Sequence, residues 1–247
     1  MNKNKTNIII SGASGFIGRA LTGELIKDGH KVFGLVRENI FCFDPAYYTN
    51  ILIQDISSNI NIDKNIRIDI LYHLAAKTHS NSNSYNDYYE VNVLGLKNIL
   101  NFTKKLKIKK IIMLSSIKVN GEGFLNNDNC YTDSGNDNPL DNYGISKMEA
   151  ENLLKEFCKN NSIDFVILRP PLVYGEGVKG NLKKLMSYID RNIPLPIIYT
   201  KNKRSLISLR NLISALIIVA IHDKARCKTY LVSDDTPISV ENLYKNI

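Results

Sequence analysis

The chain has 247 residues, of which 44% are hydrophobic, and a formal net charge of +8 from 32 Lys and Arg against 24 Asp and Glu. This composition excludes a disordered chain and allows one large α/β domain or two small ones around a proper core. The basic excess is spread out. A run of basic residues at 104–110 fits the solvated end of a helix as well as it fits a nucleic-acid surface, so it gives no specific signal for nucleic acid. We therefore expect no nucleic-acid partner.

Cysteine usage and hydropathy bear on the cellular compartment. Cysteines occur at Cys42, Cys130, Cys158 and Cys227, with no C-x-x-C pair. The longest apolar run, at 212–221, is about half the length that a bilayer requires, and a buried helix accounts for it better. The sequence therefore predicts a reduced, cytoplasmic protein with no metal site and no membrane span.

Short β-branched runs alternate with longer helical patterns along the first 170 residues. Because the apolar runs are continuous rather than alternating, they suit parallel strands that are buried on both faces. The expected strands are 7–10, 31–36, 51–54, 69–75, 110–115 and 165–170, and the expected helices are 16–28, 84–106 and 142–160. Right-handed βαβ units in series predict an α/β fold with a doubly wound parallel sheet.

The first strand runs into a glycine-rich turn, "SGASGFIG", which opens the first helix. Glycine lets the backbone turn sharply and approach a pyrophosphate, and the helix amino terminus offers unpaired N–H groups to the anion. The placement between a strand and a helix makes this spacing specific. We predict an NAD(P)-binding Rossmann domain at 1–170, with cofactor contacts from Gly12, Ser14, Gly15, Phe16, Ile17 and Gly18.

The end of the second expected strand bears on the choice between NAD and NADP. A carboxylate there binds the adenosine ribose diol of NAD, but this strand ends in Val36 and Arg37. Arginine suits a 2′-phosphate, so the sequence favours NADP slightly, while Glu38 keeps NAD open. Asp55, which closes the third strand, is a candidate partner of the adenine amine or a turn residue.

After Pro170 the pattern loosens into short segments, among them a strand-like stretch at 204–208 and the apolar helix at 212–221. No linker rich in Gly, Ser or Pro separates this part from the rest. We predict a small substrate-binding lobe at 171–247 that is interleaved with the sheet.

The expected helix at 142–160 begins "NYGISK", which puts Tyr143 and Lys147 four residues apart on one helical face. A tyrosine is a poor base at neutral pH unless a cation stabilises its phenolate. A lysine one turn along supplies that cation, so the pair suits proton exchange with a hydroxyl group.

Six motifs together carry a family resemblance: "GASGFIG", "YHLAA", "VNVLGLKNIL", "LSSIKVNGE", "YGISK" and "RPPLVYG". In this order the chain, from about residue 7 to 232, resembles the extended short-chain dehydrogenase/reductases, and within them the NAD-dependent epimerase/dehydratase family that acts on nucleotide sugars. The resemblance implies a catalytic set of Ser116, Tyr143 and Lys147, of which Tyr143 and Lys147 also contact the cofactor. It adds Asp55, Ile56, Leu74, Ala75, Ala76, Asn92 and Pro170 to the cofactor site, and it implies substrate contacts from Ser116, Lys118, Asn181 and Arg204. We expect His73 to be a buried structural histidine.

Two departures from the family pattern narrow the expected reaction. Dehydratases follow the catalytic Ser/Thr with Asp-Glu, whereas Ile117 and Lys118 stand here, so dehydration is not expected. Asn120 replaces a tyrosine that often lines the sugar pocket. The chain is most similar to a bacterial polysaccharide branch, which implies a reductase of UDP-4-keto-6-deoxy-N-acetylhexosamines that uses NADP or NAD. The alternatives are a UDP-glucose 4-epimerase type enzyme and a dinucleotide-binding regulator without catalysis.

The resemblance also bears on assembly and on the carboxyl terminus. It implies a homodimer that pairs the helices at 84–106 and 142–160, although the apolar positions there, Leu94, Ile99, Phe102, Met148, Leu153 and Phe157, equally suit packing on the sheet. Relatives continue past the position of Ile247. A natural short form, a truncated reading frame and a fragment stay open, and in each case we expect dinucleotide binding to survive while turnover depends on the further segment.

Overall fold

The computed structural model describes residues 5–56, 60, 66–78, 84–122, 131–132, 135–178 and 203–239. Its central sheet contains β1 (Asn7–Ser11), β2 (Lys31–Val36), β3 (Tyr48–Leu52), β4 (Ile70–His73), β5 (Lys110–Leu114), β6 (Asp164–Arg169) and β10 (Lys228–Leu231). The strand order is β10-β6-β5-β4-β1-β2-β3, and every neighbouring pair is parallel. The predicted doubly wound Rossmann sheet is confirmed.

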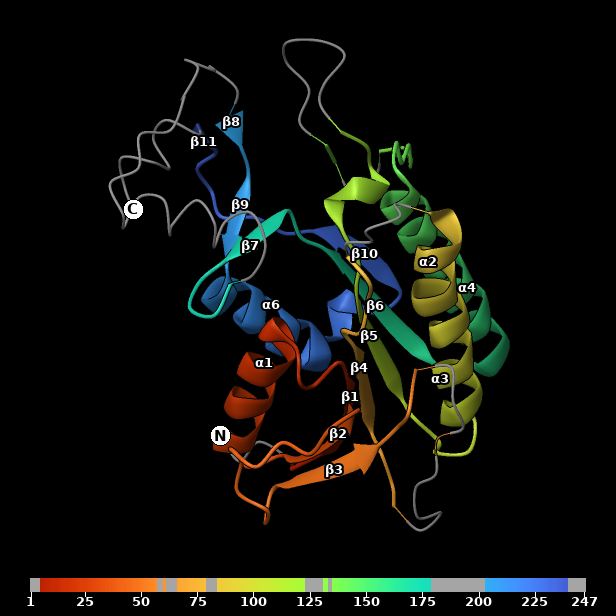
Figure 1. Ribbon diagram of the computed structural model, residues 1–247, viewed down its shortest axis with the longest axis vertical. Helices are drawn as coiled ribbons and strands as arrows, with labels where there is room; N and C mark the ends of the chain where they lie inside the picture. The colour runs from red at the N-terminus through yellow and green to blue at the C-terminus, as the bar shows by residue number, and fades with distance from the viewer. Residues whose placement is uncertain are drawn as a thin grey trace.

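Helices cover both faces of this sheet (Figure 1). One face carries α1 (Phe16–Lys27) and α6 (Leu209–Ile221). The other carries α2 (Tyr85–Tyr89), the π-helix η1 (Glu90–Leu94), α3 (Gly95–Thr103) and α4 (Asn142–Asn161). The apolar runs of the strands follow from this arrangement, since Ile9 packs toward α3 and α4 while Ile8 and Ile10 pack toward α1 and α6.

The helix expected at 84–106 is interrupted by the π-turn and ends at Thr103. In the π-turn, Asn92 is buried and its side chain hydrogen-bonds outside its own helix, to the backbone of Lys77 and to Ser146 of α4. Single π-turns inside helices often occur at functional sites. The strand expected at 69–75 ends earlier than expected, at His73, because the backbone of residues 74 and 75 turns past Gly12.

Part of the chain after Pro170 returns to the sheet and part stands beyond it (Figure 1). β10 extends the sheet beside β6, and α6 packs on the face that α1 covers. Beyond the carboxyl ends of the strands, β7 (Leu172–Tyr174) pairs with β9 (Leu206–Ser208), and β8 (Lys203–Arg204) pairs with β11 (Ile238–Ser239). Part of the segment 171–247 thus belongs to the sheet, and its assignment as a small substrate-binding lobe stays a prediction.

A carboxylate ties this outer part together. Asp234 accepts hydrogen bonds from the Tyr174 hydroxyl at 2.8 Å, the backbone N–H of Ser208 at 3.0 Å and the side-chain amide of Asn211 at 2.7 Å. These bonds join β7 to the first turn of α6. The first residues of the lobe are thereby fixed next to the carboxyl edge of the sheet.

Candidate active site

The predicted site residues gather at the carboxyl edge of the sheet. Most of the predicted cofactor segments follow a strand: the glycine turn follows β1, Arg37 follows β2, residues 55–56 lie shortly after β3, residues 74–76 follow β4, and Pro170 follows β6. Asn92 is an exception, since it lies in η1. Ligands of doubly wound sheets bind at this edge, near the point where the strand order reverses between β1 and β4.

Two glycines at the start of the chain have no room for a side chain: Gly12 in the turn between β1 and α1, and Gly18 in the first turn of α1. Gly12 has a φ of +78°, and a Cβ there would lie 2.8 Å from the backbone nitrogen of Ala75. A Cβ on Gly18 would lie 2.1 Å from the carbonyl oxygen of Gly12. Gly15 is the N-cap of α1 and makes no side-chain cap, so the first-turn N–H groups stay available to an anion. These features fit the pyrophosphate of a dinucleotide.

The residues predicted to meet the adenosine end differ in their surroundings. Arg37 and Asp55 have exposed side chains. The side chain of Ile56 is buried in the core, where it packs against Gly95, and its carbonyl oxygen accepts a hydrogen bond of 2.8 Å from Asn98. The side chain of Ile56 therefore supports the start of α3, whereas Arg37 and Asp55 are accessible to a ligand.

Asn92 fixes the segment that follows β4. Its Oδ1 accepts a hydrogen bond of 2.8 Å from the backbone N–H of Lys77, and its Nδ2 donates to the carbonyl of Lys77 at 3.1 Å and to Ser146 Oγ at 2.9 Å. The side chain thereby joins the stretch that contains Ala75 and Ala76 to the first turn of α4. Asn92 is thus a buried link between these two segments, and its place in the cofactor site stays a prediction.

The structure brings Ser116 and Tyr143 together. Ser116 follows β5 as the N-cap of a short 3-10 helix, η2 (Ile117–Val119), and its Oγ accepts a hydrogen bond of 3.2 Å from the backbone N–H of Lys118. Its hydroxyl lies close enough to Tyr143, in the first turn of α4, to influence the pKa of the tyrosine. Burial raises the pKa of Tyr143 to about 12, although the hydroxyl of Ser116 lowers it. The buried ring of Tyr88 lies 6.0 Å from the ring of Tyr143, centroid to centroid. Tyr143 is therefore protonated at neutral pH.

Lys147 lies one turn along α4 and is 1% exposed. Its Nζ donates a hydrogen bond of 2.7 Å to the carbonyl of Leu114, at the end of the strand that leads to Ser116. Burial lowers the pKa of Lys147 to about 8, against the negative charge of Glu151, which raises it. The sequence suggested that Lys147 lowers the pKa of Tyr143. In the structure, burial is the largest influence on the pKa of each of these two groups.

His73 is the buried structural histidine that the sequence suggested. Its Nδ1 lies 2.8 Å from Ser11 Oγ, which joins the ends of β4 and β1. Burial and the charge of Lys147 lower the pKa of His73 to about 3, so the ring is neutral at physiological pH.

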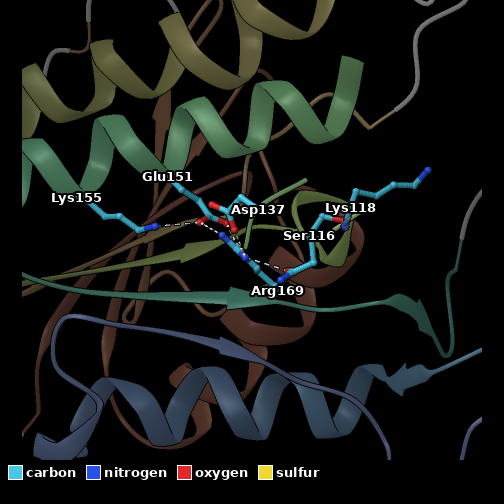
Figure 2. A network of polar contacts seen from close by, with 7 residues as sticks. Ser116, Lys118, Asp137, Glu151, Lys155 and Arg169 are labelled. Atoms are coloured by element: carbon cyan, nitrogen blue, oxygen red, sulfur yellow. Dashed lines mark hydrogen bonds and ion pairs between the residues drawn. The ribbon is translucent and has the colours of Figure 1, made fainter. Parts of the chain in front are cut away.

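The predicted substrate residues are less tightly grouped. Lys118 forms ion pairs with Asp141, at 2.8 Å, and with Glu122, and Figure 2 shows its side chain directed away from the buried cluster at Arg169. Arg204 is exposed in β8, in the part of the chain beyond the sheet. Asn181 lies outside the described residues.

The sequence prediction missed a buried polar network (Figure 2). Arg169, at the end of β6, donates to both carboxylate oxygens of Glu151 on α4, at 2.8 and 2.6 Å, and to Asn120 Oδ1 at 3.0 Å. Asp137 and Lys155 form further ion pairs with Arg169 and Glu151. A usable signal was present, because Glu151 follows Lys147 by four residues and therefore shares its helical face.

A cavity of about 300 Å³ lies beside this network. It is lined by Gly135, Asn136, Asp137, Lys155, Arg169 and Thr229, and so by none of the predicted site residues. Among the residues that the structure describes, no group of His, Cys, Asp and Glu is placed to hold a metal ion. None of the described helices combines the length and the apolar character that crossing a membrane requires.

Comparison with known proteins agrees with this geometry. The model of the NAD-dependent epimerase/dehydratase family matches residues 8–232. The chain belongs to this family. Within the family, a UDP-glucose 4-epimerase of Vibrio cholerae is 34% identical over 252 residues, which cover 99% of this chain and 76% of that protein. The N-acetyl-alpha-D-glucosaminyl-diphospho-ditrans,octacis-undecaprenol 4-epimerase of Escherichia coli O157:H7 is 32% identical over 74% of this chain and 54% of its own length.

Solved structures show that this member of the epimerase/dehydratase family shares the fold of known nucleotide-sugar proteins. UDP-glucuronic acid 4-epimerase from Bacillus cereus in complex with NAD superposes with a TM-score of 0.81 at 23% identity, covering 96% of this chain and 80% of that one. MoeE5 in complex with UDP-glucose and NAD gives a TM-score of 0.82 at 22% identity, over 96% of this chain and 79% of its own.

Proposed function

We propose that the chain is an NAD(P)-dependent enzyme that inverts the 4-position of a UDP-sugar. The place of Ser116 after β5 and of Tyr143 in the first turn of α4 carries the proposal, because these two hydroxyl groups suit acid/base chemistry beside the carboxyl edge where the glycine turn fits a dinucleotide. The 4-epimerases among the relatives support this reaction over the reductase that the sequence favoured. The undecaprenol-linked substrate named for one relative supports a role in surface polysaccharide synthesis in the cytoplasm.

The residues of this chain move a proton at the sugar hydroxyl. A bound nicotinamide would supply removal and return of a hydride at the carbon that bears this hydroxyl. Tyr143 takes up and returns the hydroxyl proton, and Ser116 Oγ holds the same oxygen by a hydrogen bond. The glycine turn and the first-turn N–H groups of α1 hold the pyrophosphate.

Positive charge must favour the phenolate of Tyr143 during this exchange, because burial alone raises its pKa to about 12. Lys147 is the cation nearest in sequence on the same helical face, and its pKa of about 8 keeps most of it protonated at neutral pH. The ammonium group is anchored on the Leu114 carbonyl, which fixes it near the end of β5.

Product analysis tests the proposed reaction. The purified chain is incubated with NAD and with UDP-glucose, UDP-N-acetylglucosamine or UDP-glucuronic acid, and 4-epimers are identified by NMR. We expect at least one epimer, and a loss of about 100-fold or more in Tyr143→Phe. Tyr47→Phe, a half-exposed tyrosine near β3, is the matched control and is expected to keep full activity. Equal conversion by Tyr143→Phe would contradict the proposal.

A 4-reductase is the second candidate, favoured by the exposed Arg37 at the position that suits a 2′-phosphate. The same residues would then donate a proton to a 4-keto oxygen. The test is oxidation of NADPH or NADH by UDP-4-keto-6-deoxy-N-acetylglucosamine, followed by absorbance. Net oxidation that Tyr143→Phe abolishes would replace the epimerase proposal. Dinucleotide binding without activity in either assay would support the regulator alternative.

A further inference from the structure

Two structural elements carry the proposed catalytic groups, and one buried arginine contacts both. Arg169 is 3% exposed and donates through Nε and Nη2 to the two oxygens of Glu151, which is fully buried on α4. Glu151 lies four residues after Lys147 and eight after Tyr143, so the three side chains follow one face of the helix. The bidentate pair therefore fixes the face of α4 that carries Tyr143 against the end of β6.

The same arginine reaches the segment that carries Ser116. Arg169 Nη1 donates to Asn120 Oδ1 at 3.0 Å, and Asn120 closes η2 through a hydrogen bond of 2.9 Å from its own N–H to the carbonyl of Ile117. The backbone on either side of Ser116 is tied to the end of β6 as well. Ser115 donates to Leu168 at 2.7 Å, and Ile117 donates to Pro170 at 3.0 Å.

Burial makes stability a poor explanation for this network. A buried ion pair loses about as much in desolvation as it gains in attraction, and apolar residues of the same size often serve stability equally well. The guanidinium group of Arg169 instead offers a rigid, planar set of donors. Such a group fixes the distance and the angle between the groups that it joins. Here those groups are the catalytic helix and the serine segment.

We infer that Asn120, Arg169 and Glu151 form a positioning chain that sets the geometry between Ser116 and Tyr143. Asn120 is the end of this positioning chain that lies next to η2. Its amide oxygen accepts a hydrogen bond from the Arg169 guanidinium, which holds η2 in place. This inference rests on the proposed function, because it assigns the positioning chain a role in orienting the groups that act on the sugar hydroxyl.

Substitutions at Asn120 test the inference with the least disturbance to the core. Asn120→Leu removes the acceptor at similar volume, and Asn120→Asp keeps an acceptor oxygen. We expect kcat per bound dinucleotide to fall by about 10-fold or more in Asn120→Leu, with KM changed by less than about 3-fold. Asn120→Asp is expected to recover kcat to within about 3-fold of wild type. Asn101→Leu, on the exposed side of α3, is the control.

Amide hydrogen exchange gives a readout that needs no turnover. If the positioning chain holds η2 in place, the amides of Val119 and Asn120 should exchange faster in Asn120→Leu than in wild type. Amides of central strands, such as those of Ile10 and Ile112, should keep their exchange rates. Asn120→Ala takes the same measurements should Asn120→Leu fail to fold.

Each result decides the matter. The inference is overturned if kcat per bound dinucleotide is unchanged in Asn120→Leu, if Asn120→Asp loses as much as Asn120→Leu, or if all amides accelerate by one factor. A wild-type chain that turns over no UDP-sugar would contradict the proposed function, and the exchange pattern would then decide the positioning role by itself.

Discussion

At the scale of single residues, burial dominates the chemistry of the candidate site. Tyr143 and Lys147 are shifted in opposite directions, the tyrosine to a pKa of about 12 and the lysine to about 8, since burial disfavours the charged form of each. His73, beside Lys147, is shifted to about 3 and stays neutral. The lysine is therefore the group in this cluster whose charge changes nearest to physiological pH.

Lys147 should leave a signature in the pH dependence of stability. The pKa of its ammonium is lower in the folded chain than in the unfolded chain, so above about pH 8 the unfolded chain binds more protons. The free energy of unfolding of wild type should therefore rise relative to Lys147→Met between about pH 8 and pH 10, by at most about 1.4 kcal/mol per pH unit. Urea unfolding of both proteins measures this difference, and a difference that stays flat would contradict the burial argument.

Arg37 makes a residue-scale prediction about cofactor choice. Its exposed guanidinium follows β2, where a 2′-phosphate would lie, and Glu38 stands next to it. We expect the wild type to bind both dinucleotides and Arg37→Ala to weaken NADP binding by about 10-fold, the value of a charge-assisted hydrogen bond, while NAD binding changes little. Fluorescence titration with NADPH and NADH measures both, and an equal loss for the two would contradict this role.

At the scale of elements, α1 and the π-turn hold the site in shape. α1 begins so close to β1 that Gly18 lies against the carbonyl of Gly12. The π-turn turns Asn92 toward the segment after β4 and toward α4 at once. Each element depends on a single residue, Gly18 in α1 and Asn92 in the π-turn, and replacing that residue would disrupt the contacts just described.

Two alanine substitutions in α1 separate close packing from helix propensity. A Cβ at position 18 would lie 2.1 Å from a backbone oxygen, so Gly18→Ala should lower the free energy of unfolding by about 1–3 kcal/mol and abolish dinucleotide binding. At Gly23 the atom nearest to an added Cβ would be 3.9 Å away, so Gly23→Ala should raise the free energy of unfolding by about 0.4–1 kcal/mol. Urea unfolding and NADH titration measure the pair, and similar effects in both would refute the packing argument.

Asn92→Ala tests the π-turn. The change leaves the N–H and carbonyl of Lys77 without their partner, so we expect a loss of about 1–3 kcal/mol in the free energy of unfolding. Asn101→Ala, exposed on α3, is the matched control and should change stability by less than about 0.5 kcal/mol. Denaturant titration of both variants gives the comparison, and an Asn92→Ala variant as stable as the control would show that the hydrogen bonds of Asn92 are dispensable for stability.

At the scale of the whole molecule, the sheet and its cofactor turn could be predicted because their signals are local. Continuous apolar runs gave the strands, and the glycine spacing gave the first turn of α1. Only the place of Glu151 on the helical face of Lys147 could be predicted for the Arg169 network, because its other partners are as many as 49 residues apart and meet only when β6, η2 and α4 come together. The π-turn escaped as well, since its cause is the contact of Asn92 with a distant backbone segment.

The packing of the whole molecule also bears on assembly. Ile99 and Phe102 are buried in the core between the helices and the sheet, so they serve the fold rather than a partner surface. Met148, Leu153 and Phe157 are only partly buried. The predicted homodimer would rest on the outward sides of α3 and α4, and it stays a prediction.

At the centre of the proposed function, Tyr143 moves the proton of the sugar hydroxyl whose carbon would exchange a hydride with a bound dinucleotide. The most direct measurement adds UDP-glucose, UDP-N-acetylglucosamine or UDP-glucuronic acid to the NAD-loaded chain and follows the absorbance of reduced nicotinamide in a single turnover. We expect reduction of the nicotinamide with at least one of these sugars in wild type and in Tyr47→Phe, and none in Tyr143→Phe. Reduction at the same rate in Tyr143→Phe, or none in wild type although NAD is bound, would contradict the proposed function.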